Sequence, residues 1–407
     1  MTSSPLVSIC IPTHKRARYL ESLLFSLADH FAAMPYSCEI VIADNASPDQ
    51  TQQVVQAFMD RLPIRYIRHP ENIGGFPNVQ FVMQQARGRY IVYLADDDSL
   101  LIEQVAEAIA KMEADPDIAV LYAPWMLFDL VADQPQGQFY TIPQDLRIER
   151  GQHKELLDHL LSHHIFPEVQ IVRREVLQRV MPRINEHAFF AFVHAADYLN
   201  QGAVLIQQQP FYVAITDYFA DDVREQLGNQ EVEYAWDRYR GGLDYVLAQA
   251  GQQVSPTERS ELQARIQQMI AVRMSVAIRL RYLGGKNPVD THVIALRLRG
   301  MGYENLCPVP ISQLATEAAL YFLLNDTELT RGIGEIVCVG EFDGDLQNFL
   351  SRNSPLPLRF LPQPPALDAL RDTLVFARNG HQLASSYDGE RHLRVVIEKE
   401  LMARFPK

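Results

Sequence analysis

Residues 88–98 read GRYIVYLADDD, a short run of apolar residues that is followed by three aspartates. Apolar residues at nearly every position are typical of a strand that is covered on both faces of a sheet. Two earlier runs, VSICI at residues 7–11 and EIVIA at residues 39–43, have the same character. The three runs together predict a mostly parallel sheet with buried strands.

A helical pattern of apolar residues follows each strand-like run in the first part of the chain. The four strand-like runs are residues 6–11, 39–43, 64–68 and 90–94. The helical run that follows each of them is, in the same order, residues 19–31, 50–59, 78–87 and 101–114. Strands that alternate with helices in this way predict a doubly wound α/β fold. Residues 119–124 predict a fifth strand.

The pattern becomes irregular after the fifth strand. Residues 129–151 are rich in Gln, Pro and Gly and predict a long loop, which is often a functional element. Beyond it we expect a short helix at residues 154–161, a strand that runs into a helix at residues 169–180, a helix at residues 189–200, and a strand-like run at residues 203–215.

Long amphipathic helices replace the strand-helix alternation after about residue 222. One helix start is marked by Ser255 at the N-cap, with Pro and then Glu inside the first turn, and two glycines at residues 284 and 285 end that helix. Strand-like runs return from residue 334. We therefore expect three parts, an α/β domain at residues 1–222, a helical segment at residues 223–332 and a small α/β domain at residues 333–407.

Composition excludes several classes of protein. The 407 residues are 47% hydrophobic and 21% charged, as in globular chains, and no apolar run approaches the roughly 18 residues that a membrane span needs. The net charge of −13 argues against nucleic acid as a partner. Basic residues follow the first apolar run instead of preceding it, which predicts a cytoplasmic protein without a secretory signal. Four cysteines without CxxC spacing are expected to be reduced packing residues.

Polar residues follow four of the predicted strands. They are residues 12–16 (PTHKR), 44–47 (DNAS), 72–75 (NIGG) and 96–98 (DDD). Because the carboxyl ends of parallel strands meet at one edge of a sheet, we expect these residues to converge there. Consecutive carboxylates offer the hard oxygen ligands that suit Mg²⁺ or Mn²⁺ carrying a diphosphate. The alternative for the three aspartates alone is a helix N-terminus stabilised by the helix dipole.

The four segments in this order, with Glu71 before NIGG, resemble the family 2 glycosyltransferases of GT-A fold over roughly residues 5–220. The resemblance implies a Rossmann-like GT-A domain at residues 1–222 that binds a nucleotide-sugar donor. It also implies a divalent cation, Mn²⁺ or Mg²⁺, at the acidic motif, and for most members inversion at the anomeric carbon.

The resemblance assigns seven residues to donor binding. They lie in or beside the loops after the first three predicted strands: Pro12, Thr13, Arg16, Asp44, Asn72, Gly74 and Gly75. Those of the first loop match the segment that lies along the nucleotide, and Asp44 matches the acid that pairs with the base. The third loop matches the turn over the ribose and phosphates, where glycine lets the backbone approach closely.

The acidic motif departs from the family pattern at one position. Many members have an aspartate where this chain has Ala95, so two registers of the motif are open. We expect Asp96 and Asp98 to be the metal-binding pair, with Asp98 as the direct ligand. Asp96 and Asp97 are also expected at the donor diphosphate.

The resemblance also implies a catalytic base on a downstream helix, in a Glu-Asp pair. Asp197 matches the aspartate, Ala196 replaces the glutamate, and the Arg-Arg-Glu segment at residues 173–175 precedes the base as in many members. A carboxylate in this role removes the proton from an acceptor hydroxyl. Asp217 is an alternative base, and His194 is a further candidate for a role at the site.

The leading interpretation is a metal-dependent inverting glycosyltransferase that uses a UDP-sugar and a glycan, lipid-linked or protein acceptor, in bacterial surface polysaccharide synthesis. A sugar-phosphate nucleotidyltransferase would want a Gly-rich loop where this chain has Thr-His-Lys-Arg. A non-catalytic scaffold is suggested by Ala95 and Ala196, but the three aspartates and Asp197 are retained. No family resemblance is found in residues 225–407, and the open roles for their helices are acceptor binding, a partner or a second copy of the chain through residues 223–407. Peripheral membrane contact is a further possibility for the chain.

Overall fold

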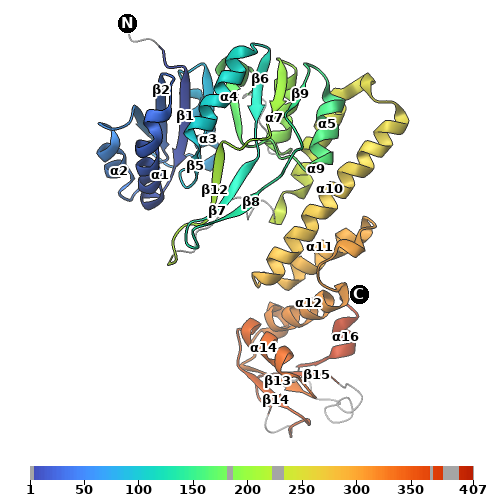
Figure 1. Cartoon of the computed structure of the whole chain (residues 1–407). Helices are drawn as coiled ribbons and strands as arrows, with labels where there is room; N and C mark the ends of the chain where they lie inside the picture. The colour runs from blue at the N-terminus through green and yellow to red at the C-terminus, as the bar shows by residue number, and fades with distance from the viewer. Residues whose placement is uncertain (1–3, 181–186, 222–232, 367–369, 379–393, 407) are drawn as a thin grey trace. The chain divides into compact units, whose positions relative to one another are not determined.

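The computed structural model describes residues 4–180, 187–221, 233–366, 370–378 and 394–406 (Figure 1). Contacts within the chain group it into two compact units. The first unit contains residues 1–226 and 237–269, and the second contains residues 227–236 and 270–407. The division into three domains with boundaries at residues 222 and 333 remains a prediction.

The first unit contains an eight-stranded sheet with the order β3-β2-β1-β4-β10-β6-β11-β9. Its strands are β1 (Val7–Thr13), β2 (Cys38–Asp44), β3 (Ile64–Arg68), β4 (Tyr90–Tyr93), β6 (Ile118–Tyr122), β9 (Leu146–Ile148), β10 (Gln170–Arg173) and β11 (Ala203–Ile206). The neighbours β3, β2, β1 and β4 are parallel to one another, and β6 is parallel to β11. Strand β10 runs antiparallel to its neighbours β4 and β6, and β9 runs antiparallel to β11. The predicted mostly parallel sheet is confirmed, and the predicted fifth strand is β6.

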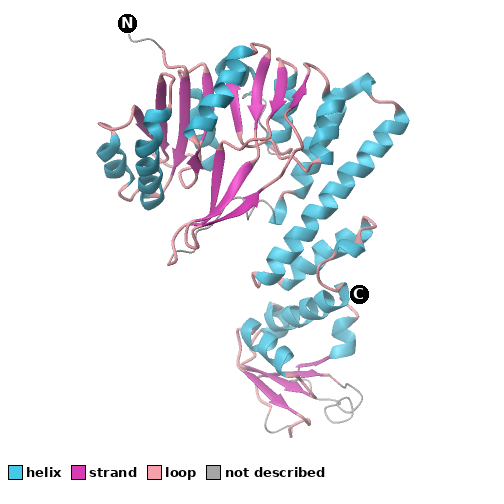
Figure 2. Ribbon diagram, in the orientation of Figure 1, coloured by secondary structure: helices cyan, strands magenta, loops and turns pink. Residues whose placement is uncertain are grey.

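Helices cover the faces of this sheet (Figure 2). They are α1 (Ala17–His30), α2 (Thr51–Phe58), α3 (Gly75–Gln84), α4 (Ile102–Ala114), α5 (His153–Ser162), α6 (Arg174–Val180) and α7 (Phe190–Leu199). Because both faces are covered, successive residues of the central strands, such as Ile9, Cys10 and Ile11 of β1, are all buried. This arrangement leaves the loops at the strand ends to carry the polar residues.

The predicted long loop at residues 129–151 is wrong over much of its length. A second sheet with the order β5-β12-β7-β8 is built from β5 (Ser99–Leu100), β12 (Tyr212–Asp217), β7 (Trp125–Asp129) and β8 (Gln134–Gln138). All five residues of β8 are exposed, so it carries no apolar alternation and is held by backbone pairing with β7. The predicted strand-like run at residues 203–215 divides into β11 and β12, which belong to different sheets.

The long helix α10 (Pro256–Leu283) begins as the sequence predicts. The Ser255 hydroxyl accepts from the Glu258 amide at 3.3 Å, and the Glu258 carboxylate accepts from the Ser255 amide at 2.9 Å. Gly285, with φ of +59°, follows its end. The other helices of the central part of the chain are α9 (Trp236–Ala250), α11 (Pro288–Gly300) and α12 (Ile311–Asn325).

The C-terminal part of the second unit is a four-stranded parallel sheet with the order β14-β13-β15-β16. Its elements are β13 (Glu335–Val339), α14 (Gly344–Asn353), β14 (Leu358–Leu361), β15 (Thr373–Ala377), β16 (Arg394–Ile397) and α16 (Glu398–Met402). The expected return of strand-helix alternation is confirmed. Leu320, Leu323 and Leu324 of α12 pack into the same core as the sheet, so this core extends beyond the predicted boundary at residue 333.

All four cysteines are free, and Cys10 and Cys338 are buried as packing residues. Within the described part of the chain, no helix combines the length and the apolar character that crossing a membrane requires. The cytoplasmic location remains a prediction.

Candidate active site

The ends of β1 and β2 place two of the predicted donor-binding residues side by side. Thr13 and Asp44 are direct partners in the parallel ladder, and Pro12 pairs one position earlier with Ala43. Thr13 and Asp44 are both buried. The chain then turns at Lys15, whose φ of +56° lies in the left-handed region, and Arg16 follows immediately before α1.

Asp44 is fully buried, and both of its carboxylate oxygens accept hydrogen bonds. Oδ1 accepts from the Ser47 amide at 2.8 Å, and Oδ2 accepts from the Tyr66 hydroxyl and lies 3.4 Å from Nε of Arg68. Tyr66 and Arg68 come from the neighbouring strand β3. The sequence analysis missed both residues, although the register of β2 and β3, which pairs Asp44 with Arg68, accounts for their position.

The turn before α3 is tied to the loop after β2 by side-chain amides. Asn72 Oδ1 accepts from Asn45 Nδ2 and from the Gly74 amide, each at 2.8 Å. Asn72 Nδ2 lies 3.2 Å from His14 Nε2, which joins the first loop to the same cluster. Gly74 has a φ of +94°, which a residue with Cβ rarely adopts, and Gly75 begins the helix. Asn45 and His14 are site residues that the sequence analysis did not single out by number.

The acidic motif after β4 meets the first loop through Arg16. The Arg16 guanidinium forms an ion pair with Asp97 and lies 3.6 Å from Asp96 Oδ1. Asp96 is buried, and burial raises its pKa above the ordinary value, with a further rise from the charge of Asp97. Arg16 and the hydroxyl of Thr13 act in the opposite direction. Four of the predicted site residues are therefore in one electrostatic cluster.

Asp98 faces the second sheet. Its Oδ2 accepts from the Tyr212 hydroxyl at 2.7 Å, and its Oδ1 accepts from the Ile215 amide at 2.9 Å. Both partners belong to β12, so Asp98 fixes this strand beside the acidic motif. These bonds do not test the predicted role of Asp98 as the direct metal ligand, which remains a prediction.

The carboxylates of Asp96 and Asp97 suit a divalent cation. They are hard oxygen donors whose charges repel one another, and a cation would relieve this repulsion. Within the described residues, no group of three or more His, Cys, Asp or Glu side chains is spaced to hold a metal ion. The remaining ligands would have to come from a diphosphate and water, which is how Mg²⁺ is usually bound beside phosphates.

Asp197, the predicted catalytic base, is fully buried in α7. Its Oδ1 accepts from the Tyr245 hydroxyl of α9 at 2.8 Å. His194, one turn earlier, is 4% exposed, and its Nε2 makes no hydrogen bond within the described residues. Burial lowers the pKa of His194 to about 4. The alternative base Asp217 is exposed at the end of β12.

The Arg-Arg-Glu segment that led to Asp197 has a structural role. Arg173 donates from Nε to the Ile118 carbonyl and from Nη2 to the Met112 carbonyl, each at 2.7 Å. A third bond joins its Nη1 to the Tyr90 hydroxyl at 2.9 Å. Arg173 thus satisfies carbonyl groups at the end of α4 and links it to the sheet.

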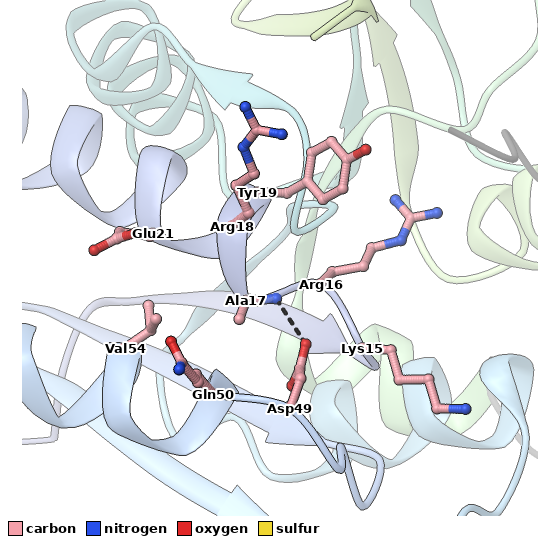
Figure 3. A pocket seen from close by; sticks show the side chains of 9 residues that line it. All are labelled: Lys15, Arg16, Ala17, Arg18, Tyr19, Glu21, Asp49, Gln50 and Val54. Atoms are coloured by element: carbon pink, nitrogen blue, oxygen red, sulfur yellow. Dashed lines mark hydrogen bonds between the residues drawn. The ribbon is translucent and has the colours of Figure 1, made fainter. Parts of the chain in front are cut away.

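A hollow of about 450 Å³ lies beside the start of α1 (Figure 3). Lys15, Arg16 and Arg18 line it with Asp49, which accepts a hydrogen bond from the Ala17 amide at 3.2 Å. Arg16, a predicted donor-binding residue, lines this hollow and also forms the ion pair with Asp97. Glu21 also lines the hollow, so its lining carries both basic and acidic side chains.

Comparison with known proteins agrees with this geometry. Residues 8–181 match the family model described as Glycosyl transferase family 2. This stretch is a family 2 glycosyltransferase domain. It contains β1 to β4, the acidic motif and the loops described above, so the predicted family is confirmed.

Parts of the chain are also similar to two curated relatives and to one solved structure. The abequosyltransferase RfbV of Salmonella typhimurium is 33% identical over 115 residues, which are 28% of this chain and 34% of RfbV. The poly(ribitol-phosphate) beta-N-acetylglucosaminyltransferase TarS of Staphylococcus aureus is 30% identical over 108 residues, 26% of this chain and 18% of TarS. The solved structure of residues 1–349 of S. aureus TarS aligns with a TM-score of 0.47 and 15% identity, over 75% of this chain and 90% of that chain. The chain thus spans about a third or less of these curated relatives.

Proposed function

We propose that the chain is a metal-dependent, inverting glycosyltransferase that moves a sugar from a nucleotide-sugar donor, preferably a UDP-sugar, to an acceptor hydroxyl. One observation carries the proposal. Loops after four strands of a family 2 domain bring Thr13, Asp44, Asn72 and the pair of Arg16 and Asp97 to one edge of the sheet. This edge is where doubly wound sheets bind their ligands.

The donor would lie across these loops. Asp44 is fully buried and bonded to Ser47 and Tyr66, so pairing of its carboxylate with the base requires these contacts to rearrange when the donor binds. The Asn72–Asn45 pair would fix the turn over the ribose and phosphates. Asp96 and Asp98 would hold the cation, Mn²⁺ or Mg²⁺, with Asp98 as the direct ligand and Asp97 beside them at the donor diphosphate. When bound, the cation supplies positive charge that stabilises the departing diphosphate.

The acceptor hydroxyl would attack the anomeric carbon in a single displacement that breaks the bond from this carbon to the nucleoside diphosphate, while a carboxylate takes the hydroxyl proton. Asp197 remains our proposed base, on the strength of the family resemblance. Because Asp197 is buried and bonded to Tyr245, this role requires the α7–α9 contact to open in the complex with acceptor. Exposed Asp217 is the alternative, since β12 lies beside the acidic motif through Asp98.

The names of the two relatives support a proposal for the acceptor class. RfbV is named for transfer of abequose and TarS for transfer of N-acetylglucosamine to poly(ribitol-phosphate). We infer that this chain also builds a bacterial surface polysaccharide, with a glycan, lipid-linked or protein acceptor, on the cytoplasmic side.

A thermal-shift screen tests the proposal directly. UDP-, GDP-, CDP- and dTDP-sugars would each be added with Mn²⁺ and with EDTA, and the melting temperature recorded. A ligand that binds the folded state alone raises this temperature by mass action. We expect at least one nucleotide sugar to raise it in Mn²⁺ and to lose the effect in EDTA. No shift with any nucleotide sugar would favour the scaffold interpretation instead.

A further inference from the structure

Two large apolar side chains are exposed at the rim of the donor site. Ile73 is 38% exposed and directly follows Asn72, and Phe76, in the first turn of α3, is 41% exposed. The Ile73 amide donates to Asn45 Oδ1 at 2.8 Å, so this segment is fixed to the loop after β2. Exposed apolar side chains that gather beside a polar site can form part of a ligand-binding groove.

Phe76 is supported by an aromatic residue from another element. The ring of Phe190, in the first turn of α7, lies 5.7 Å from the ring of Phe76 at an interplanar angle of 57°. Phe190 in turn packs against buried Phe189 at 5.1 Å and against His194 at 5.7 Å. The pair is therefore anchored in the core of the domain, and little side-chain entropy remains to be lost when a ligand binds.

We propose that Phe76 and Phe190 form a platform on which a sugar ring of the acceptor stacks. The inference rests on the proposed function and names the acceptor subsite of the same site. One face of a pyranose is a set of C–H groups with weak positive charge, which complements the negative face of an aromatic ring. The hydroxyls around the ring can meanwhile bond to polar groups such as Asn72.

Size and position favour a sugar over other occupants. The exposed apolar side chains at this rim are Ile73 and Phe76, and two side chains cannot supply the roughly 1,000 Å² that a stable protein interface buries. Phe190 belongs to α7, the helix that carries the proposed base, whereas Ile73 and Phe76 adjoin the turn assigned to the donor phosphates. The platform thus connects the donor side of the site to the helix where proton removal is proposed.

Saturation-transfer NMR with simple sugars tests the platform. The probes are the methyl glycosides of glucose, galactose, mannose, rhamnose and N-acetylglucosamine, each added to the full chain with UDP and Mn²⁺. The variants are Phe76→Ala, Phe76→Trp and Phe190→Ala. Phe25→Ala is the matched control, because Phe25 is 55% exposed on α1 and packs beside Arg61.

We expect at least one glycoside to receive saturation at its ring protons from the wild type. Phe76→Ala and Phe190→Ala should weaken its binding by roughly fivefold or more, and Phe76→Trp and Phe25→Ala should retain it. The melting-temperature shift with UDP should be the same in all variants. Glycoside binding that Phe76→Ala leaves unchanged, or a wild type that binds none of the five, would overturn the platform. If the wild type does not bind UDP in the presence of Mn²⁺, the proposed function would be overturned instead.

Discussion

The guanidinium of Arg16 forms an ion pair with the carboxylate of Asp97, which joins the loop after β1 to the acidic motif after β4. The side chains of Arg16, Asp96 and Asp97 are 23%, 9% and 14% exposed. Partly buried charges of this kind depend strongly on their partners, since water screens them less than surface charges. The ion pair therefore holds the loop after β1 and the acidic motif after β4 together.

Replacing Arg16 by Gln should destabilise the site. Asp96 and Asp97 would lose their neighbouring positive charge, and we expect the free energy of unfolding to fall by roughly 1–3 kcal/mol, with weaker binding of nucleotide sugar. Urea unfolding and calorimetry measure the two effects. Arg331→Gln is the control, because Arg331 and its partner Glu328 are both exposed and such pairs contribute about 0–1 kcal/mol. Equal effects of the two substitutions would contradict a special role for Arg16.

Asp98 can be tested separately as a structural residue and as a metal ligand. Asp98→Ala removes the carboxylate. Tyr212→Phe leaves the carboxylate in place and removes the 2.7 Å bond to it, together with the 3.2 Å bond that the Tyr212 hydroxyl accepts from the Ala95 amide. We expect both variants to lower the melting temperature and only Asp98→Ala to abolish the dependence of UDP binding on Mn²⁺. If Asp98→Ala keeps the full Mn²⁺ dependence, Asp98 serves β12 alone and the ligands are Asp96 and Asp97.

The sheet could be predicted because its strands are buried on both faces. Continuous apolar runs such as VSICI and YIVYL are unusual outside such strands, and the helices between them have clear periodicity. The hairpin of β7 and β8 could not be predicted, because β8 is exposed throughout and backbone pairing leaves no side-chain pattern.

The site was predictable as a set of loops but not as a set of contacts. Asn72 and Asp44 could be named, whereas their partners Asn45 and Tyr66 depend on strand register and turn geometry, which the sequence does not display. The burial of Asp197 did have a signal. Residues Ala191 to Leu199 of α7 are all buried, and a helix that is apolar nearly all round belongs to the core.

Asp197 and Tyr245 test the proposed base. If Asp197 takes the acceptor proton, Asp197→Asn should lower turnover by roughly 10²–10⁴ while donor affinity stays the same. Tyr245→Phe removes the bond to Asp197 and should leave most of the turnover. The measurements are transfer rate at saturating donor and acceptor, and donor binding by calorimetry. A lower melting temperature with a near wild-type rate in Asp197→Asn would make Asp197 a structural residue and favour Asp217.

His194 should make the protein sensitive to acid. Its pKa is lowered by burial from the ordinary value of 6.5 to about 4, so the unfolded chain binds the proton more readily than the folded chain between these values. Stability is therefore retained above pH 6.5 and lost as the pH falls toward 4. His194→Phe should reduce the loss, measured as melting temperature against pH. Exposed His30, replaced by Gln, should leave the profile unchanged, and an unchanged profile in His194→Phe would contradict the argument.

The central claim is that this edge of the sheet binds a nucleotide sugar through a cation held by the acidic motif. Calorimetry of UDP binding to the wild type and to Asp96→Asn, each in Mn²⁺ and in EDTA, tests it most directly. The account predicts binding to the wild type in Mn²⁺, much weaker binding in EDTA, and little difference between the two conditions in Asp96→Asn. Equal affinity of the wild type in Mn²⁺ and EDTA, for UDP and for every other nucleotide diphosphate tried, would contradict it.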